Sequence, residues 1–124
     1  MSGDLSPHFN RAEFACRDGC GFDTVDSELL LALEQIRMHF NAPIIITSGC
    51  RCQQHNDTVG GSKTSQHLYG RAADFKVKGV PLMEVRNYAE KILDGEGGLG
   101  YYPRENGGWL HLDTRTNGGA RWNG

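Results

Sequence analysis

Two histidines and one aspartate are the residues of this chain whose types and spacing could do chemistry. His67 and Asp74 stand seven positions apart, and His111 follows within residues 109–113. Imidazole nitrogens and a carboxylate oxygen are ligands that zinc accepts, and three protein ligands leave a fourth position open. An open position is typical of a catalytic zinc site, so the chemistry would be that of a metal ion acting on water.

Plainer interpretations of these residues stay open at the level of spacing. A histidine taken alone is more often a surface or hydrogen-bonded side chain than a ligand. Asp113, two residues after His111, could orient the imidazole instead of acting itself, as carboxylates often do beside metal sites. Asp74 is harder to dismiss, because strands disfavour aspartate.

Asp74 is predicted to lie on a strand that follows a loop carrying His67. Gly70 between them allows a bend, and the β-prone run 72–77 argues against one helix that carries both residues. Since successive side chains of a strand point to opposite faces, Ala72 and Asp74 are expected to share one face.

His111 is predicted to lie on a second strand, over residues 109–114. The leucines of this run alternate with His111 and Asp113, which predicts one apolar and one polar face. If this strand pairs near the strand of Asp74, the three candidate ligands converge.

The other elements complete an α+β fold, an antiparallel sheet with helices packed on one side, in one domain over residues 1–124. The apolar stripe after Asp26 predicts a helix to residue 40, and Pro81 opens a second helix at its first position. The run 43–48 lacks alternation, which predicts a strand buried on both faces. A further strand is expected at 99–102, and the Gly-rich tail from Asn117 is expected to be mobile.

Composition excludes several classes of protein. The chain has 124 residues, 38% hydrophobic and 23% charged, which indicates a globular protein. The net charge of −2, without a long basic run, argues against nucleic acid as a partner. No apolar stretch approaches the ~20 residues of a membrane span. Residues 1–10 lack the basic start and apolar run of a secretory signal, so we expect synthesis in the cytoplasm.

The spacing of the four cysteines does not determine whether they are free thiols or form disulfides. Cys16, Cys20, Cys50 and Cys52 are spaced C-x3-C and C-x-C, which is not the spacing of common zinc ribbons. Inert thiols and a structural staple between the two pairs are both compatible with this pattern.

Taken together, the motifs resemble the peptidase M15 group of zinc D,D-carboxypeptidases, D,D-dipeptidases and phage endolysins, which shares its fold with the hedgehog signalling domain. The similarity covers about residues 5–115, and the opening of the chain resembles the M15A-like branch. The motifs are Ser65-x-His67-x-x-Gly70-x-Ala72-x-Asp74, the later His111-x-Asp113, the upstream Ser48-Gly49-x-Arg51, and Leu5-Ser6-x-x-Phe9-x-x-x-Glu13-Phe14.

The resemblance implies one Zn²⁺ ion held by His67, Asp74 and His111, and a hedgehog/DD-peptidase-like fold. It also implies that Arg51 contacts the substrate, where its guanidinium could serve a carboxylate or a developing oxyanion. The implied substrates are the stem peptides of bacterial peptidoglycan, and we expect a monomer. Further candidates for the substrate cleft are Ser65, Gln66, Tyr69, Tyr101, Tyr102 and Trp109.

The general base is the weakest part of the match. Many relatives carry an acid three residues before the last zinc histidine, where this chain has Gly108, and others a histidine where it has Trp109. Glu105 and Asp113 are the carboxylates nearby, and Glu105 is the preferred candidate because Asp113 suits an orienting role equally well.

Two kinds of function follow from these expectations. The first is a peptidoglycan peptidase, with the cleaved bond left open, acting on the wall as a phage or prophage endolysin after lysis or as part of a virion. The second is a catalytically silent, zinc-containing module that binds cell wall or serves a phage tail, which the departures at Gly108 and Trp109 allow.

Overall fold

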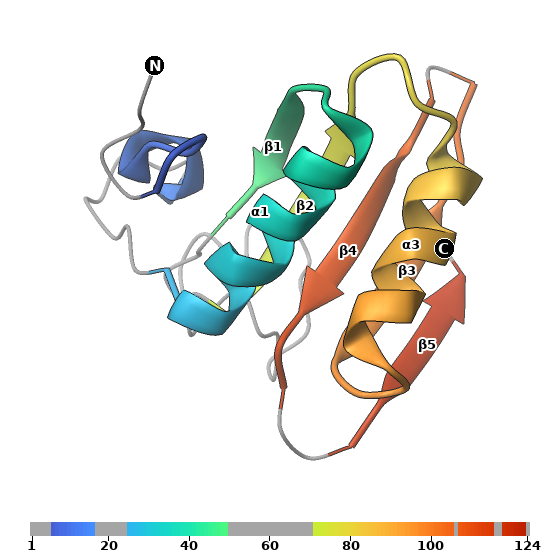
Figure 1. Ribbon diagram of the computed structural model, residues 1–124. Helices are drawn as coiled ribbons and strands as arrows, with labels where there is room; N and C mark the ends of the chain where they lie inside the picture. Colours follow the sequence, from blue (N-terminus) through green and yellow to red (C-terminus); the bar gives the residue numbers. More distant parts are fainter. Residues whose placement is uncertain (1–5, 17–24, 50–70, 106, 116–117, 124) are drawn as a thin grey trace.

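A sheet of five strands in the order β1-β2-β4-β3-β5 forms the back of the molecule (Figure 1). The computed structural model describes residues 6–16, 25–49, 71–105, 107–115 and 118–123. Three neighbouring pairs of strands are antiparallel, and β3 with β5 is parallel. The strands are β1 (Ile44–Ser48), β2 (Ala72–Val77), β3 (Gly98–Tyr102), β4 (Trp109–Asp113) and β5 (Ala120–Asn123).

Helix α1 (Ser27–Phe40) forms where its apolar stripe predicts it. The Asp26 carboxylate accepts hydrogen bonds from the backbone N–H groups of Glu28 and Leu29, and so caps the first turn. The stripe of Leu29, Leu33 and Ile36 is buried. The helix ends because the next residue, Asn41, adopts a left-handed conformation.

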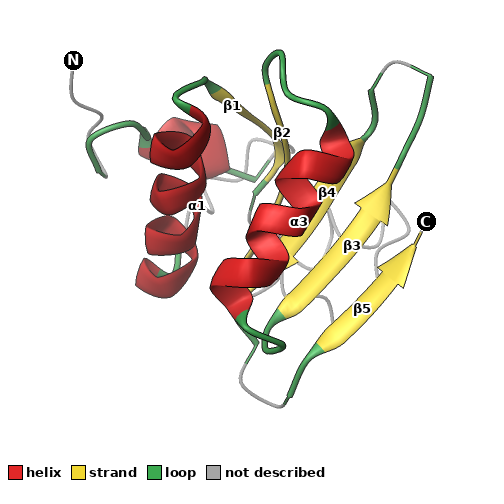
Figure 2. Ribbon diagram, turned by 45° about the vertical axis from the view of Figure 1, so that its right-hand side comes forward, coloured by secondary structure: helices red, strands yellow, loops and turns green. Residues whose placement is uncertain are grey.

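Helix α3 (Leu82–Leu93) lies beside α1 on the same face of the sheet, as Figure 2 shows. Pro81 is its N-cap and not its first helical residue, which corrects the prediction by one position. Val85 and Ala89 enter the core formed by both helices and by the apolar face of the sheet. The predicted α+β class, with helices on one side of a mostly antiparallel sheet, is confirmed. Within the described ranges, no helix combines the length and apolar character that a bilayer span requires.

The N-terminal segment packs against α1 through a buried carboxylate. Phe9 and Phe14, at either end of helix η1 (Arg11–Phe14), belong to the core. Glu34 of α1 is only 7% exposed, and it accepts hydrogen bonds from the Ser6 hydroxyl (2.5 Å) and the His8 backbone (2.9 Å) and contacts His8 Nδ1 (2.5 Å). Burial by itself would raise the pKa of Glu34, but these hydrogen bonds outweigh it and lower the pKa.

Strand β1 is not buried on both faces as its uninterrupted apolar run predicts. It is an edge strand, and its exposure alternates, with Ile44 and Ile46 buried and Ile45 44% exposed. The reason is that both helices cover the same side of the sheet, so the other side of β1 faces outward.

The C-terminal tail, predicted to be mobile, contains strand β5. Arg121 donates from Nε and Nη2 to the two carboxylate oxygens of Glu90 on α3, each at 2.7 Å, and from Nη1 to the carbonyl of Gly97. A strand whose side-chain partner lies 31 residues away carries no local signal, and Gly118 and Gly119 just before it favour a loop assignment.

Replacing Glu34 by Gln is expected to lower the free energy of unfolding at pH 7 by about 1–3 kcal/mol, because charge-assisted hydrogen bonds in a buried place are lost. Since the folded pKa of Glu34 lies below its ordinary value of 4.5, its ionised form stabilises the fold above that value. The contribution is lost as pH falls through the lowered folded pKa. Denaturant unfolding between pH 3 and pH 8 should therefore show the two proteins converging at acid pH.

The matched control for this measurement is Glu28→Gln, on the exposed side of the same helix. A loss at pH 7 as large as that of Glu34→Gln would contradict the assigned role of the buried carboxylate.

Candidate metal centre

One row of residues crosses all five strands and carries the predicted site. The register pairs Ser48 with Asp74, Asp74 with His111, His111 with Gly100, and Gly100 with Trp122. Asp74 and His111, 37 residues apart in sequence, are therefore direct neighbours on one face. This is the face that α1 and α3 leave uncovered (Figure 2).

The imidazole of His111 lies between two carboxylates. Its Nδ1 is 3.0 Å from Oδ1 of Asp74, and its Nε2 is 2.7 Å from Oδ2 of Asp113. His111 is 8% exposed and Asp113 is fully buried. The predicted convergence of the two strands' polar faces is thus observed for these three side chains.

Asp113 is held by a guanidinium fork. Arg115 donates from Nε to Oδ1 at 2.8 Å and from Nη2 to Oδ2 at 2.6 Å, and its backbone N–H also reaches Oδ1 at 3.2 Å. Burial would raise the pKa of Asp113, but the hydrogen bonds from Arg115 and His111 outweigh it and hold the pKa well below its ordinary value. Asp113 is therefore an anion that accepts the Nε2–H of His111.

This arrangement sets the chemistry of the other ring nitrogen. Burial by itself would lower the pKa of His111, but the bonds to Asp113 and Asp74 outweigh it and raise the pKa. With Nε2–H donated to Asp113, Nδ1 and the Asp74 oxygen are two acceptors 3.0 Å apart, which need a proton or a cation between them. Two ligands of one tetrahedral zinc, each about 2.0–2.2 Å from the ion, lie about 3.3–3.6 Å apart. The Nδ1–Oδ1 distance of 3.0 Å is a few tenths of an ångström shorter, so the two atoms could serve as ligands of one metal ion after a small separation.

Two glycines of β3 make room for this centre. A Cβ atom on Gly98, which pairs with Asp113, would collide with the Asp113 carboxylate. A Cβ atom on Gly100 would lie 2.6 Å from Nε1 of Trp122. Both positions require a residue without a side chain because neighbouring strands send theirs across β3.

An aromatic group borders the centre. Tyr102 and Trp109 are a cross-strand pair with stacked rings, 5.0 Å between centroids and 6° between planes. Trp122 donates its indole N–H to the Tyr102 hydroxyl at 2.5 Å, and its ring lies 5.0 Å from that of His111. The Arg104 guanidinium lies 5.0 Å above the Trp109 ring.

Two other predicted residues lie outside the row of Asp74 and His111. Tyr101 packs against the core, on the opposite face from His111, which speaks against its predicted place in a substrate cleft. Glu105 is exposed in the loop between β3 and β4, beyond the Tyr102–Trp109 pair. Gly108 has φ 69°, and a Cβ atom there would collide with the backbone of Tyr102, so this backbone has no space for an acidic side chain.

Several predictions lie outside the described residues. They concern His67, Arg51, Ser65, Gln66 and Tyr69, and three of the four cysteines; Cys16 is described and is buried. Within the described part of the chain, no group of three or more His, Cys, Asp or Glu side chains has a metal-binding arrangement. The predicted third ligand, His67, therefore stays a prediction.

Sequence reasoning missed Arg115, Trp122 and the paired glycines Gly98 and Gly100. The tripeptide Asp113-Thr114-Arg115 places an acid and a base at i and i+2, which is the spacing of one strand face and could have suggested the fork. Trp122 carried no such signal, because its strand was not predicted.

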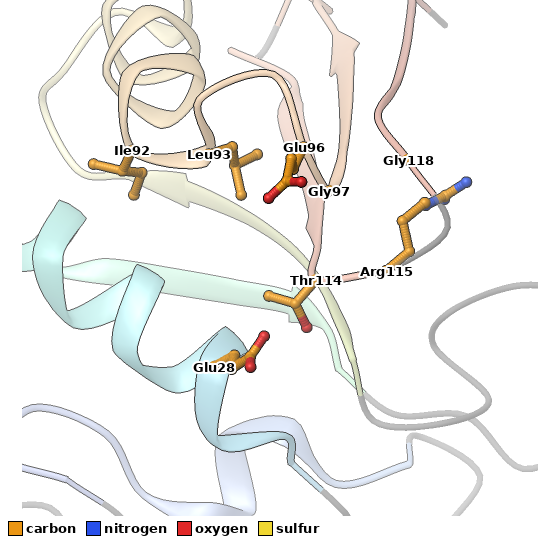
Figure 3. A pocket seen from close by; sticks show the side chains of 8 residues that line it. All are labelled: Glu28, Ile92, Leu93, Glu96, Gly97, Thr114, Arg115 and Gly118. Carbon is orange, nitrogen blue, oxygen red and sulfur yellow. The ribbon is translucent and has the colours of Figure 1, made fainter.

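A pocket at the end of β4 adjoins this centre through Arg115, which lines it. Figure 3 shows Thr114 directed toward the start of α1 and Arg115 directed away from it. The Thr114 hydroxyl donates to the carboxylate of Asp26 at 3.1 Å, so the end of β4 is tied to the cap of α1. The pocket is lined by Glu28, Ile92, Leu93, Glu96, Gly97, Thr114, Arg115 and Gly118.

Comparisons with known proteins agree with the resemblance in the motifs. A family model described as Peptidase M15 matches residues 7–113. The probable peptidoglycan L,D-endopeptidase MepK of Haemophilus influenzae is 39% identical over 79 residues, 60% of this chain and 40% of that protein. The peptidoglycan L,D-endopeptidase MepK of Escherichia coli strain K12 is 36% identical over 77 residues, 58% of this chain and 40% of that protein. The chain thus spans about two fifths of the length of these curated relatives.

Substituting Gly98 by Ala is expected to destabilise the protein by about 3 kcal/mol or more, because Asp113 must move and a buried ion pair breaks. Gly107→Ala is the control, since Gly107 also cannot change without cost (φ 102°) but has open space around it. Its expected cost is backbone strain alone, about 1 kcal/mol. Urea unfolding of both variants measures the difference, and equal losses would argue against the packing of Asp113 over β3.

Proposed function

This chain belongs to the peptidase M15 family, and on that premise we propose that it is a zinc-dependent peptidase that hydrolyses peptide bonds of bacterial peptidoglycan. The observation that carries the proposal is the cross-strand pair of Asp74 and His111, with the ring of His111 oriented by Asp113. A carboxylate oxygen and an imidazole lone pair facing one another are the donor set of a zinc peptidase.

The residues of the chain have distinct tasks in this proposal. Asp74 and His111, together with His67, hold the ion; when bound, zinc polarises the scissile carbonyl and lowers the pKa of water. Asp113 keeps the proton of His111 on Nε2, so that Nδ1 is the coordinating atom. Arg51 is assigned to a carboxylate or the developing negative charge of the substrate, and Ser65 and Gln66 are assigned to substrate binding.

The aromatic group beside His111 is proposed as a wall of the substrate cleft. Tyr102, Trp109 and Trp122 border the centre on the open face of the sheet. Rigid aromatic side chains offer contact area at low entropic cost. Of the two tyrosines predicted for the cleft, Tyr102 lies beside Trp109 on the side of His111, whereas Tyr101 packs against the core.

The peptide bond is proposed to be internal, not terminal. The relatives named above are L,D-endopeptidases, which favours an endopeptidase over the D,D-carboxypeptidase that the motif resemblance also allows.

Glu105 is proposed as the general base. Asp113 is a poor candidate, because both of its oxygens accept hydrogen bonds and its pKa is held well below the range of a base poised near neutrality. Glu105 is exposed and lies in the loop that adjoins the Tyr102–Trp109 pair.

A second candidate function is a zinc-containing module that binds cell wall without cleaving it. It is favoured by the backbone at Gly108, which has no space for the acid that many M15 enzymes carry there. The two candidates differ in whether new peptide ends appear in peptidoglycan.

Digestion of purified peptidoglycan, followed by mass spectrometry of the fragments, tests the proposal. The wild-type protein is expected to release fragments whose masses identify an L,D bond, and a chelator is expected to stop the release until zinc is restored. Asp74→Asn and His111→Ala are expected to lose both zinc binding and fragment release, because each removes a ligand.

Asp94→Asn, in the exposed turn after α3, is the matched control and should behave as the wild type does. If the wild type binds zinc and yields no fragments from any wall preparation, the silent module is the better description.

Glu105→Gln is expected to lower kcat about 100-fold or more without weakening zinc binding, because a positioned base contributes about 10²–10⁴-fold. The pair of measurements is fragment release over time and zinc affinity by competition with a chromophoric chelator. Glu84→Gln, an exposed glutamate on α3, is the control. Undiminished turnover in Glu105→Gln would exclude this residue as the base.

A further inference from the structure

We infer that Arg115 is a positioning residue for the metal centre: its guanidinium fork fixes the plane of the Asp113 carboxylate and thereby selects which nitrogen of His111 faces Asp74. The inference rests on the zinc site of the proposed function. It assigns a role to a residue that lies just beyond the family match, which ends at residue 113.

The contacts of Asp113 show how the fork acts. Oδ1 accepts from the Nε and the backbone N–H of Arg115, and Oδ2 is shared between Nη2 of Arg115 and Nε2 of His111. A carboxylate held at both oxygens cannot rotate about its last torsion. Oδ2 therefore stays in the position from which it contacts His111.

Neighbouring residues restrict the position of the Arg115–Asp113 pair. Gly98 on β3 provides the space that the Asp113 carboxylate occupies. The Arg115 guanidinium carbon lies 5.5 Å from the centroid of the Trp122 ring, within the range of a cation–π contact. The preceding residue, Thr114, is bonded to Asp26 at the start of α1, so the backbone of this turn is also held.

The fork affects His111 because its two ring nitrogens face different carboxylates. With Oδ2 fixed, Nε2 donates its proton to Asp113 and Nδ1 presents its lone pair toward Asp74. Without the fork, the carboxylate can turn, and the ring is no longer confined to the orientation that points Nδ1 toward Asp74. Arg115 thus acts on the metal ion only through Asp113 and His111.

The chain supplies a matched control for this role. Arg121 makes the same two-pronged contact with Glu90, through Nε and Nη2 at 2.7 Å each, but with a residue of α3. Leu99, its partner on β3, is a core residue, so Arg121 belongs to the helix-covered face. Removing Arg121 costs a similar ion pair, while the hydrogen bonds of His111 to Asp74 and Asp113 involve no atom of Arg121 and β5 is also held by its ladder with β3.

The experiment compares Arg115→Met, Arg115→Lys and Arg121→Met in the full chain. Zinc affinity is measured by competition with a chromophoric chelator, folding by thermal unfolding, and the protonated ring nitrogen of His111 by ¹⁵N NMR of the zinc-loaded protein. Arg115→Met is expected to weaken zinc binding about tenfold or more, as changes behind a metal-bound histidine do. Arg115→Lys is expected to lose less, because the charge stays and only the fork is lost.

Arg121→Met is expected to lower the unfolding temperature while its zinc affinity stays within about twofold of wild type, since the control leaves the positioning contacts intact. The His111 ring is expected to show a protonated Nε2 in the wild type and in Arg121→Met, and a second form in Arg115→Met. Wild-type affinity and an unchanged ring spectrum in Arg115→Met would overturn the inference. So would an equal loss of affinity in Arg121→Met.

If Arg115→Met does not fold, Arg115→Lys decides, and unchanged zinc affinity in that variant overturns the inference. The proposed function is judged separately by fragment release. A wild type that binds zinc but cuts no peptidoglycan ends that function and leaves the role of Arg115 standing.

Discussion

The pairing register between β2 and β4 is the constraint on which the centre depends. It places Asp74 directly opposite His111, although 37 residues separate them in sequence. Because side chains alternate between faces, a slip of one residue would turn His111 toward the helices and bring Leu110 or Leu112 to the open face. The buried Phe75 and the two leucines hold the register from the core side. Packing of the apolar face thus determines the geometry of the polar one.

The two faces of the sheet are specialised by what covers them. Helices α1 and α3 cover one face (Figure 2). The other face carries a buried imidazole, two carboxylates and three aromatic rings. Burying a charge is costly unless it is paired and hydrogen-bonded, and Arg115 meets that condition for Asp113. The two carboxylates and the imidazole come from the neighbouring strands β2 and β4, and Arg115 follows the end of β4 directly.

Much of this architecture follows from local sequence pattern. The stripe of α1, its cap at Asp26, the strand of Asp74 and the polar face of β4 were predicted correctly, because each depends on residues close together in the chain. The errors concern long-range partners: β1 alternates in burial because it lies at the edge with one face uncovered by the helices, and β5 was missed because its partners, β3 and Glu90, are distant in sequence. Asp113 could be predicted as a partner of His111 because it lies two residues away on the same strand, whereas Trp122 lies on a strand that was not predicted. Of the adjacent tyrosines predicted for a cleft, Tyr101 packs against the core because successive residues of β3 face opposite sides of the sheet.

The last strand has a practical consequence for anyone who trims the chain to its recognisable family boundary. The match ends at Asp113, before Arg115, Arg121 and Trp122. A protein shortened to that boundary keeps Asp74 and His111, yet it loses the guanidinium behind Asp113 and the indole that covers Gly100. It would also expose the outer edge of β3, a hydrogen-bonding template that invites aggregation. The family match therefore ends before residues that contact Asp113 and complete the sheet.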